Sequence, residues 1–324
     1  MYIQIHIANE FCETYMPFLL FRDCIFSILS KYYANNSHVH IEYIKNVEEI
    51  KHDKDTIVLL NMYDLTLYDN KERIIDVLEN MNTFFLIVNT EHWETRGAKN
   101  ILTKLENEKR ENTVVIEYNI INYRNILESY PNVQMLFLPL LYNEYMEEYY
   151  GRYTDNVTIC WDQKPIDILF YGGLNDRRRC ILEQLQQKYR VHIVDSHHGV
   201  SNIELCKLIS QSKVVINILY YDFNVIFDYY RNTFLLSNDA LLVTEIPREM
   251  DKTVEYWLDE LEENMIVSTY DNLVTTVDKC LKQNEEQVRM RIEKQRKWFS
   301  NFNMADIIVP FFEYFLIQNK FCTI

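Results

Sequence analysis

Strand-like and helix-like segments alternate along almost the whole chain, and this alternation limits the possible folds more than any other feature. Short apolar runs are followed by segments in which apolar residues recur every three or four positions. The strand-like segments of the first half are MYIQIHIA (1–8), HVHIEYI (38–44), DTIVLLN (55–61), TFFLIVN (83–89), NTVVIEYN (112–119) and NVQMLFLPL (132–140). Strands that are apolar on both faces and separated by helices predict a parallel sheet covered by helices on each side.

The same alternation restarts at Ile166, after a polar, tyrosine-rich segment at 149–165 that is predicted to be the linker. The strand-like segments of the second half are DILFYG (167–172), RVHIVD (190–195), KVVINILYY (213–221) and ALLVTE (240–245). We therefore expect an α/β fold of two doubly wound parallel-sheet domains, at 1–155 and 156–304, and a closing helix at 305–324.

Charge and cysteine content narrow the class of partner and the compartment. The 324 residues include 48 acidic and 33 basic ones, a net charge of -15, which opposes binding through broad neutralisation of phosphates and predicts no nucleic-acid partner. The seven cysteines form no C-x-x-C pair, and no cationic leader precedes the first strand. We therefore expect a cytoplasmic location, which for a viral protein would be the cytoplasm of the host cell. The apolar runs are too short for a membrane span.

The loop after DILFY has the strongest signal for chemistry. Gly172 and Gly173 end the strand, and Asn175 or Asp176 can cap the next helix. The first turn of that helix contains Arg177, Arg178 and Arg179. Cations oppose the helix dipole at this end, so they indicate an anion, such as a diphosphate, held between amide donors and guanidinium groups. The alternative is a tight turn whose arginines are solvated.

Two further loops leave predicted strands at the same edge of the sheet. Asp195 ends the strand-like segment at 190–195, and His198 and Gly199 follow it. Loop contacts to a ligand, a metal site with His192, or a solvated loop are the alternatives. Asn217 is a polar residue inside an apolar strand, and it needs hydrogen-bond partners from neighbouring strands or a ligand.

Asp228 and Arg231 are three residues apart on the helix that follows this strand, so they share one face of it. They can contact a ligand at the strand ends. The alternative is a surface ion pair.

Taken in order, these segments resemble the donor-binding domain of nucleotide-sugar glycosyltransferases of the GT-B fold, of a group found in bacteria and large DNA viruses. The segments that carry the resemblance are YGGLNDRRR (171–179), NILYY (217–221), DYYR (228–231) and LLSND (235–239). It extends more weakly into the first half through NTEHW (89–93), IEYNIINYRNIL (116–127) and LPLLY (138–142).

The resemblance implies two Rossmann-like domains, with a UDP- or GDP-sugar on the second, an acceptor on the first, and a closing helix that returns to the first. The acceptor would be a glycan or a protein- or lipid-linked hydroxyl. The implied donor-binding residues are Gly172, Gly173, Asn175, Arg177, Arg178, Asp195, His198, Gly199, Asn217, Tyr220, Asp228, Arg231 and Ser237.

The chain departs from the family at two places. Asp228 stands where related enzymes usually have glutamate, and a glutamate pair eight positions apart, found in many retaining members, is absent. Two alternatives to a transferase therefore remain: a non-catalytic nucleotide-sugar-binding or scaffold protein, and a nucleotide-sugar epimerase.

Glu91 and His92 are the candidates for the catalytic base, because the segment NTEHWETRG begins where the strand TFFLIVN ends, which places them at its carboxyl edge. Asp64 is another candidate. The alternative for Glu91 is a capping or loop carboxylate, and a retaining enzyme of this fold need not use a base of its own.

The transfer would pass through an oxocarbenium-like state while negative charge grows on the departing diphosphate. We expect the helix N-terminus with Arg177 or Arg178, assisted by Arg231, to stabilise that charge in place of a divalent ion, so no metal and no cofactor are predicted. A D-x-D string at 53–55 precedes its strand and is interpreted as a solvated turn.

P-loop, dinucleotide, serine-hydrolase and zincin motifs are missing. The charged helix at 288–298 is expected to pack inward, with peripheral membrane contact as the alternative.

Overall fold

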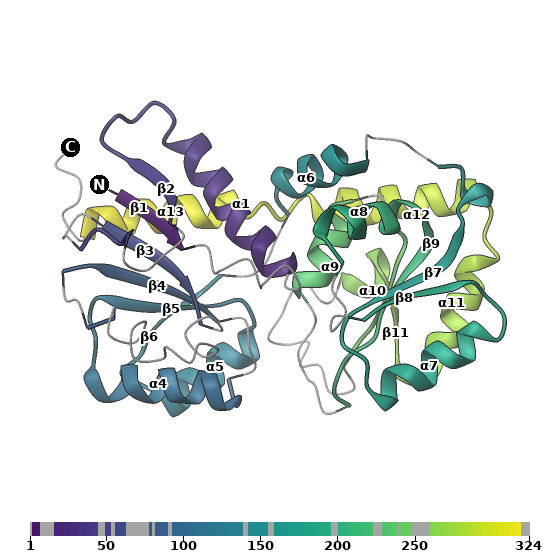
Figure 1. Ribbon diagram of the computed structural model, residues 1–324, viewed down its shortest axis with the longest axis horizontal. Coiled ribbons are helices and arrows are strands. Elements are labelled where there is room, and N and C mark those ends of the chain that lie inside the picture. Colours follow the sequence, from purple (N-terminus) through teal and green to yellow (C-terminus); the bar gives the residue numbers. More distant parts are fainter. Residues whose placement is uncertain are drawn as a thin grey trace. The chain divides into compact units, whose positions relative to one another are not determined.

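The chain folds into two compact units, each built around one parallel sheet (Figure 1). The computed structural model describes residues 2–6, 16–44, 49–52, 56–62, 78–79, 82–89, 93–138, 142–154, 159–195, 200–222, 229–238, 240–247 and 260–318. The first unit consists of Met1–Cys12, Phe21–Pro139 and Met304–Ile324, and the second of Glu13–Leu20 and Leu140–Asn303. The boundary therefore falls between Pro139 and Leu140, earlier in the chain than the predicted one after residue 155.

The first unit contains a six-stranded sheet in the order β2-β1-β3-β4-β5-β6, and every pair in it is parallel. Its strands are β1 (Tyr2–His6), β2 (His40–Ile44), β3 (Thr56–Asn61), β4 (Phe84–Asn89), β5 (Thr113–Glu117) and β6 (Gln134–Phe137). Every residue of β3, β4 and β5 is buried, which explains why these segments are apolar without alternation.

The first unit's helices are α1 (Met16–Tyr32, whose first residues belong to the second unit), α4 (Arg96–Glu108), α5 (Ile120–Ser129) and α13 (Ala305–Gln318). Helix α4 shows how the sequence sets their limits. The Thr95 side chain caps its start by accepting from the amide of Ala98 at 3.3 Å, and Lys109 ends it in the left-handed conformation. The residues at 98, 101, 102 and 105 form its buried face, which packs on β3, β4 and β5.

Helix α13 belongs to the first unit although it is the last element of the chain. Met304, Ile308 and Phe312 are buried, and Glu313 accepts a hydrogen bond from the hydroxyl of Tyr32 on α1. These contacts bury one side of α13, most of whose residues are hydrophobic.

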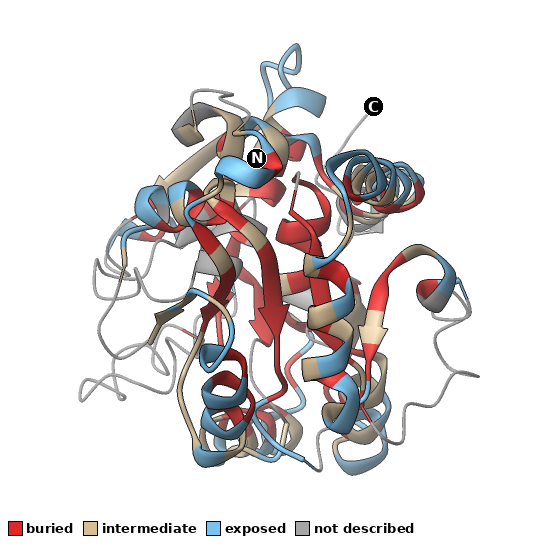
Figure 2. Cartoon of the chain, turned by 90° about the vertical axis from the view of Figure 1, so that its right-hand side faces the viewer, coloured by how far each residue is buried: buried red, intermediate tan, exposed pale blue. Residues whose placement is uncertain are grey.

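The second unit contains a five-stranded parallel sheet in the order β11-β10-β9-β7-β8. Its strands are β7 (Ile166–Tyr171), β8 (Val191–Val194), β9 (Ser212–Asn217), β10 (Leu242–Glu245) and β11 (Ile266–Ser268). Its helices are α6 (Glu144–Thr154), α7 (Asp176–Gln186), α8 (Asn202–Ser210), α9 (Tyr229–Leu236), α10 (Leu261–Asn264), α11 (Leu273–Leu281) and α12 (Glu285–Phe299), with short 3₁₀ turns η3 (Trp161–Gln163) and η5 (Tyr270–Asn272). Figure 2 shows buried strands flanked by helices whose outer faces are exposed.

The two sheets confirm the predicted α/β class, and two differences have physical causes. Strand β11 was not predicted, because three residues are too few to show a period. Residues 149–154 of the predicted linker form the end of α6, since the tyrosines at 145, 149 and 150 follow a helical spacing. None of the helices in the described part of the chain is both long and apolar enough to cross a bilayer.

The strand order of the second sheet places a switch point between β7 and β9. After β7 the chain adds β8 on one side, and then it crosses to β9 on the other side and continues outward. Ligands of open α/β sheets bind beyond the carboxyl ends of the strands at such a point, because the two loops there diverge and leave a crevice. The loops after β7 and β9 are therefore the place to look for a site.

Candidate functional site

Gly172 directly follows β7 and is the centre of the candidate site. Its φ of 140° lies in a region that side chains with a β-carbon rarely adopt. A β-carbon built on it would lie 3.0 Å from Nη2 of Arg231 and 3.3 Å from Nη1 of Arg178. The backbone conformation thus favours glycine here, and two guanidinium groups from different helices approach the same point.

Asn175 fixes the turn that follows. Its side-chain oxygen accepts from the amide of Arg178 at 2.9 Å, which caps α7 as the sequence predicts. Its side-chain nitrogen donates to the carbonyl of Tyr220 at 2.6 Å. One asparagine therefore joins the start of α7 to the loop after β9, across the switch point.

Arg178 is buried and held by main-chain oxygens. Its Nε donates to the carbonyl of Ile218 at 2.9 Å, and its Nη1 donates to that of Gly173 at 2.7 Å. The guanidinium carbon lies 5.0 Å from the ring centre of Tyr220 and 5.4 Å from that of Phe170. These contacts fix the orientation of the side chain beside Gly172.

Arg231 reaches the same place from α9. Its Nη1 donates to Oδ1 of Asn217 at 2.5 Å, and its guanidinium carbon lies 5.0 Å from the ring centre of Tyr171. It is half-buried. Asp228, the predicted ion-pair partner of Arg231, lies outside the described residues, so that pair stays a prediction.

Asn217 is completely buried at the end of β9. Its Nδ2 donates to Oγ1 of Thr244 on the neighbouring strand at 3.0 Å and to Oδ1 of Asn232 at 3.3 Å. A buried amide needs hydrogen-bond partners, and those of Asn217 come from β10 and α9. With both donors engaged, Asn217 presents its oxygen to Arg231.

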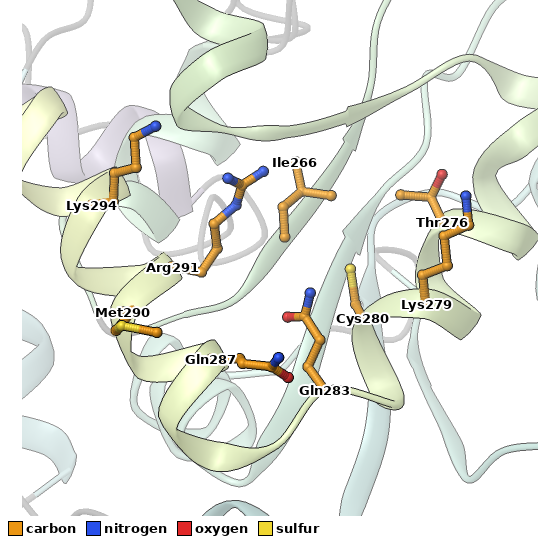
Figure 3. Close-up of a pocket in the computed structure, with 9 residues that line it drawn as sticks. All are labelled: Ile266, Thr276, Lys279, Cys280, Gln283, Gln287, Met290, Arg291 and Lys294. Atoms are coloured by element: carbon orange, nitrogen blue, oxygen red, sulfur yellow. The ribbon is translucent and has the colours of Figure 1, made fainter.

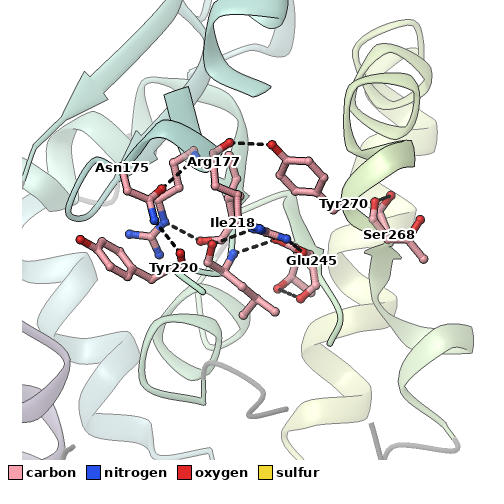
Figure 4. Close-up of polar contacts among 11 residues, drawn as sticks. Asn175, Arg177, Ile218, Tyr220, Glu245, Ser268 and Tyr270 are labelled. Atoms are coloured by element: carbon pink, nitrogen blue, oxygen red, sulfur yellow. Dashed lines mark hydrogen bonds and ion pairs between the residues drawn. The ribbon is translucent and has the colours of Figure 1, made fainter. Parts of the chain in front are cut away.

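Arg177 has a different environment from the adjacent Arg178. Figure 4 shows Arg177 with Glu245 and Tyr270. Arg177 forms a two-pronged ion pair with the buried carboxylate of Glu245, with Nη1 at 2.8 Å from Oε2, and it also donates to the carbonyl of Leu219 at 2.8 Å. The ring of Tyr270 lies 4.0 Å from its guanidinium carbon. Arg177 thus connects α7 to the ends of β9 and β10 and does not point at Gly172.

Glu245 and Tyr270 were not predicted. The carboxylate of Glu245 also accepts from the amide of Leu219 at 2.9 Å, and the hydroxyl of Tyr270 donates to the carbonyl of Arg177 at 2.7 Å. The available signal for Glu245 was an acidic residue at the carboxyl end of the apolar strand ALLVTE. Tyr270 gave none.

The other predicted donor residues divide into three groups. Tyr220 lies at the site with 38% of its surface exposed, and Asp195 directly follows β8. Ser237 lies elsewhere: it directly follows α9, at the amino side of the sheet, and its buried hydroxyl donates to the carbonyl of Thr233 at 2.9 Å. Residues outside the described part of the chain are Glu91, His92, His198, Gly199, Asp228, Asp64 and the D-x-D string at 53–55.

The first unit has one unusual acid at the carboxyl edge of its sheet. Glu117 ends β5 beside Asn89 of β4, and both are completely buried. Asn89 Nδ2 donates to Glu117 Oε2 at 2.6 Å, and the amide of Asn119 donates to Oε1 at 2.9 Å. Burial raises the pKa of Glu117 to about 8, against the opposite effect of these hydrogen bonds, so this side chain is mostly protonated at neutral pH.

The chemistry of the second-unit site suits a phosphate-bearing ligand. Two guanidinium groups provide forked donors, and the start of α7 adds main-chain amides and the positive end of the helix dipole. Among the described residues, no three His, Cys, Asp or Glu side chains gather as they would around a metal ion.

No protein-family model matches the sequence, and no curated protein is significantly similar to it. Solved structures are similar over almost the full length of both chains. They include T4 phage β-glucosyltransferase in complex with UDP and Mn²⁺, with a TM-score of 0.58, 12% identity and coverage of 98% of this chain and 99% of that one. The chain has the GT-B fold.

Two further structures share this fold. A structure of the DNA-modifying enzyme β-glucosyltransferase, studied with and without uridine diphosphoglucose, gives a TM-score of 0.54, 12% identity and coverage of 98% and 99%. The N-terminal domain of Candida albicans trehalose-6-phosphate phosphatase gives 0.53, 8% and coverage of 98% and 96%.

The comparison corrects one prediction. We expected a transferase of this fold to need no metal, but the T4 phage structure holds Mn²⁺ together with UDP. The prediction of metal independence is therefore wrong and is not carried further.

Proposed function

We propose that this protein is a glycosyltransferase that moves a sugar from a nucleotide-sugar donor to an acceptor hydroxyl. The observation that carries the proposal is the approach of Arg178 and Arg231 to Gly172 at the switch point between β7 and β9. A diphosphate is the group that two guanidinium forks and a helix N-terminus bind together. The UDP and uridine diphosphoglucose bound by the T4 phage and β-glucosyltransferase structures support the same ligand class.

In this proposal Arg178 and Arg231 bind the diphosphate and stabilise the charge that develops on it as the glycosidic bond breaks. Both are held in place before the donor arrives, Arg178 by two carbonyls and Arg231 by Asn217. Little reorganisation is then needed in the transition state. No step is assigned to a metal ion, although a divalent ion bound with the diphosphate would supply further positive charge there.

Arg177 is a positioning residue in this scheme. Its pairing with Glu245 ties the first turn of α7 to the loop at 218–220, whose carbonyls bind Arg178 and Asn175. The ion pair therefore sets the spacing between the two loops of the site. It acts on the donor through those loops.

The acceptor side belongs to the first unit in this proposal, with Glu91 or His92 as the group that takes the hydroxyl proton. We propose a glycan or a protein- or lipid-linked acceptor. The β-glucosyltransferase of the same fold modifies DNA, but a net charge of -15 opposes the phosphate neutralisation on which DNA binding depends.

The test is a donor panel. UDP-, GDP-, TDP- and CMP-sugars are screened for thermal stabilisation and then for slow hydrolysis of the sugar, in Mn²⁺, in Mg²⁺ and in EDTA. Arg178→Gln and Arg231→Gln should weaken binding of the preferred donor at least tenfold. Arg179→Gln is the matched control, because Arg179 is exposed on the same helix, 3.6 Å from Asp176.

Each result separates the candidates. Stabilisation followed by hydrolysis or transfer supports the transferase. Stabilisation with neither indicates a nucleotide-sugar-binding protein, and conversion of the donor to its epimer indicates an epimerase. Equal donor affinity in the Arg178, Arg231 and Arg179 variants would remove the basis of the site assignment.

A further inference from the structure

A cavity of about 470 Å³ lies in the second unit where β11 begins, between α11 and α12 (Figure 3). Three cations line it: Lys279 from α11, and Arg291 and Lys294 from α12. Gln283 and Gln287 add amide groups. The cavity is at the amino edge of the sheet, whereas Gly172 and its two arginines are at the carboxyl edge, so the two sites are distinct.

The charged residues that line this cavity are all cations. Its lining contains no acidic residue, and within the part of the chain that the structure describes neither Lys279 nor Arg291 forms an ion pair. Lys294 donates to a main-chain carbonyl, that of Glu263, at 2.8 Å. Burial raises the pKa of the thiol of Cys280, which also lines the cavity, to about 11, so this group stays neutral. The cavity is thus basic in a chain whose net charge is -15.

A larger cavity of the same unit shows the contrast. It measures about 790 Å³, and its lining combines four acidic with four basic residues. Arg296 there binds Glu147 through two contacts of 3.0 and 2.6 Å, and Arg289 lies 3.9 Å from Glu293. Two cations of that cavity are thus paired with acids of its own lining, and the smaller cavity lacks this arrangement.

The helix sequence does not supply acids to the smaller cavity either. Arg291 and Lys294 are three residues apart on α12, so they repel each other on one face, and the neighbours four positions from Arg291 are Gln287 and Gln295. The nearby Lys282 differs, since it pairs with Asp278 at 2.6 Å. A face that gathers like charges without a compensating acid is suited to an anion from outside the chain.

We propose that this cavity binds a phosphate-bearing anion. Arg291 supplies a fork that fits phosphate oxygens, Lys279 and Lys294 supply ammonium groups on either side of it, and the two glutamines can donate amide hydrogens. A volume of about 470 Å³ lies within the range of small-ligand pockets. This inference does not depend on the transferase proposal, and its ligand is either a soluble phosphorylated compound or the headgroup of an anionic lipid.

The test locates binding first and measures it second. Lysine acetylation by a succinimidyl acetate is followed by mass spectrometry, with and without inorganic tripolyphosphate. Lys279 and Lys294 should be protected several-fold, and Lys282 should not be. This experiment uses the unaltered chain, so it does not depend on a variant that folds.

Affinity is then compared between two double variants. K279Q/R291Q removes two cavity cations. K282Q/R289Q removes the same residue types from ion-paired positions, Lys282 directly after α11 and Arg289 on α12. Tripolyphosphate binding by calorimetry and co-sedimentation with phosphatidylserine vesicles, against phosphatidylcholine vesicles, are measured for both, with circular dichroism to check folding. We expect at least a tenfold loss in K279Q/R291Q and less than a twofold change in K282Q/R289Q.

The calorimetry and the co-sedimentation together also identify the source of the phosphate. A loss seen with tripolyphosphate alone supports a soluble ligand, and a loss seen with vesicles supports a lipid headgroup. Equal binding by both double variants, or acetylation of Lys279 that tripolyphosphate does not change, would overturn the proposal.

Discussion

Arg231 on α9 donates from Nη1 to Oδ1 of Asn217 at the end of β9, over a distance of 2.5 Å. Asn217 can present this oxygen only because both hydrogens of its amide are engaged by Thr244 and Asn232. A buried strand residue therefore orients a guanidinium group that reaches Gly172. The amide of Asn217 supplies no charge of its own.

Replacement of this amide by a carboxylate tests that arrangement. In Asn217→Asp the new charge would pair with Arg231 and compete with a phosphate, so we expect UDP affinity to fall about tenfold by calorimetry. The lost donors to Thr244 and Asn232 should also lower the free energy of unfolding by about 1–3 kcal/mol in urea. Asn301→Asp, at an exposed position, is the control. Unchanged UDP affinity in folded Asn217→Asp would show that Arg231 does not bind the ligand.

Gly172→Ala tests the space above β7. The new methyl group would lie 3.0 Å from Arg231 Nη2, and a φ of 140° is strained for alanine by about 1–3 kcal/mol. We expect both weaker UDP binding and a lower melting temperature. Gly173→Ala is the matched control, because Gly172 is the glycine with positive φ among the described residues. Equal effects of the two substitutions would contradict the specific role of Gly172.

Much of this fold could be predicted from the sequence, because parallel strands buried on both faces leave an unmistakable apolar pattern. The cap at Asn175 and the need for partners at Asn217 were equally local signals. The residues around Arg177 and Arg178 do not show which of the two arginines faces the site. Adjacent helical residues point about 100° apart, and which one faces the site depends on how α7 packs.

The acids of the two sheet edges were missed for a related reason. Glu245 matters because it meets Arg177, which is 68 residues away in the chain, and Glu117 matters because β4 places Asn89 beside it. Each is the acidic residue at the end of a mainly apolar strand. Sequence gives its position, and only the pairing of strands and helices gives its partner.

The ion pair between Arg177 and Glu245 should affect stability more than it affects ligand contact. Glu245→Gln leaves a guanidinium group with 15% side-chain exposure beside a neutral amide, so we expect a loss of about 1–3 kcal/mol in urea unfolding, reduced by that partial exposure. Arg177→Gln should lose a similar amount. In the double variant the losses should not add, with a coupling of about 1–2 kcal/mol. Additive losses would mean that the two side chains act separately.

Glu117 should give the stability of the first unit a pH dependence of unusual sign. Its pKa is raised from 4.5 to about 8 by burial, so the folded state holds a proton that the unfolded state releases above about pH 4.5. The stabilisation is complete below that pH and is lost as the pH rises toward 8, by up to about 1.4 kcal/mol per pH unit.

Glu117→Gln keeps the neutral shape and removes the titration. We therefore expect the difference in melting temperature between Glu117→Gln and the unaltered chain to grow from pH 5 to pH 8 in favour of the variant. Glu111→Gln, at an exposed position, should show no such trend. A constant difference over this range would mean that Glu117 is ionised in the folded protein.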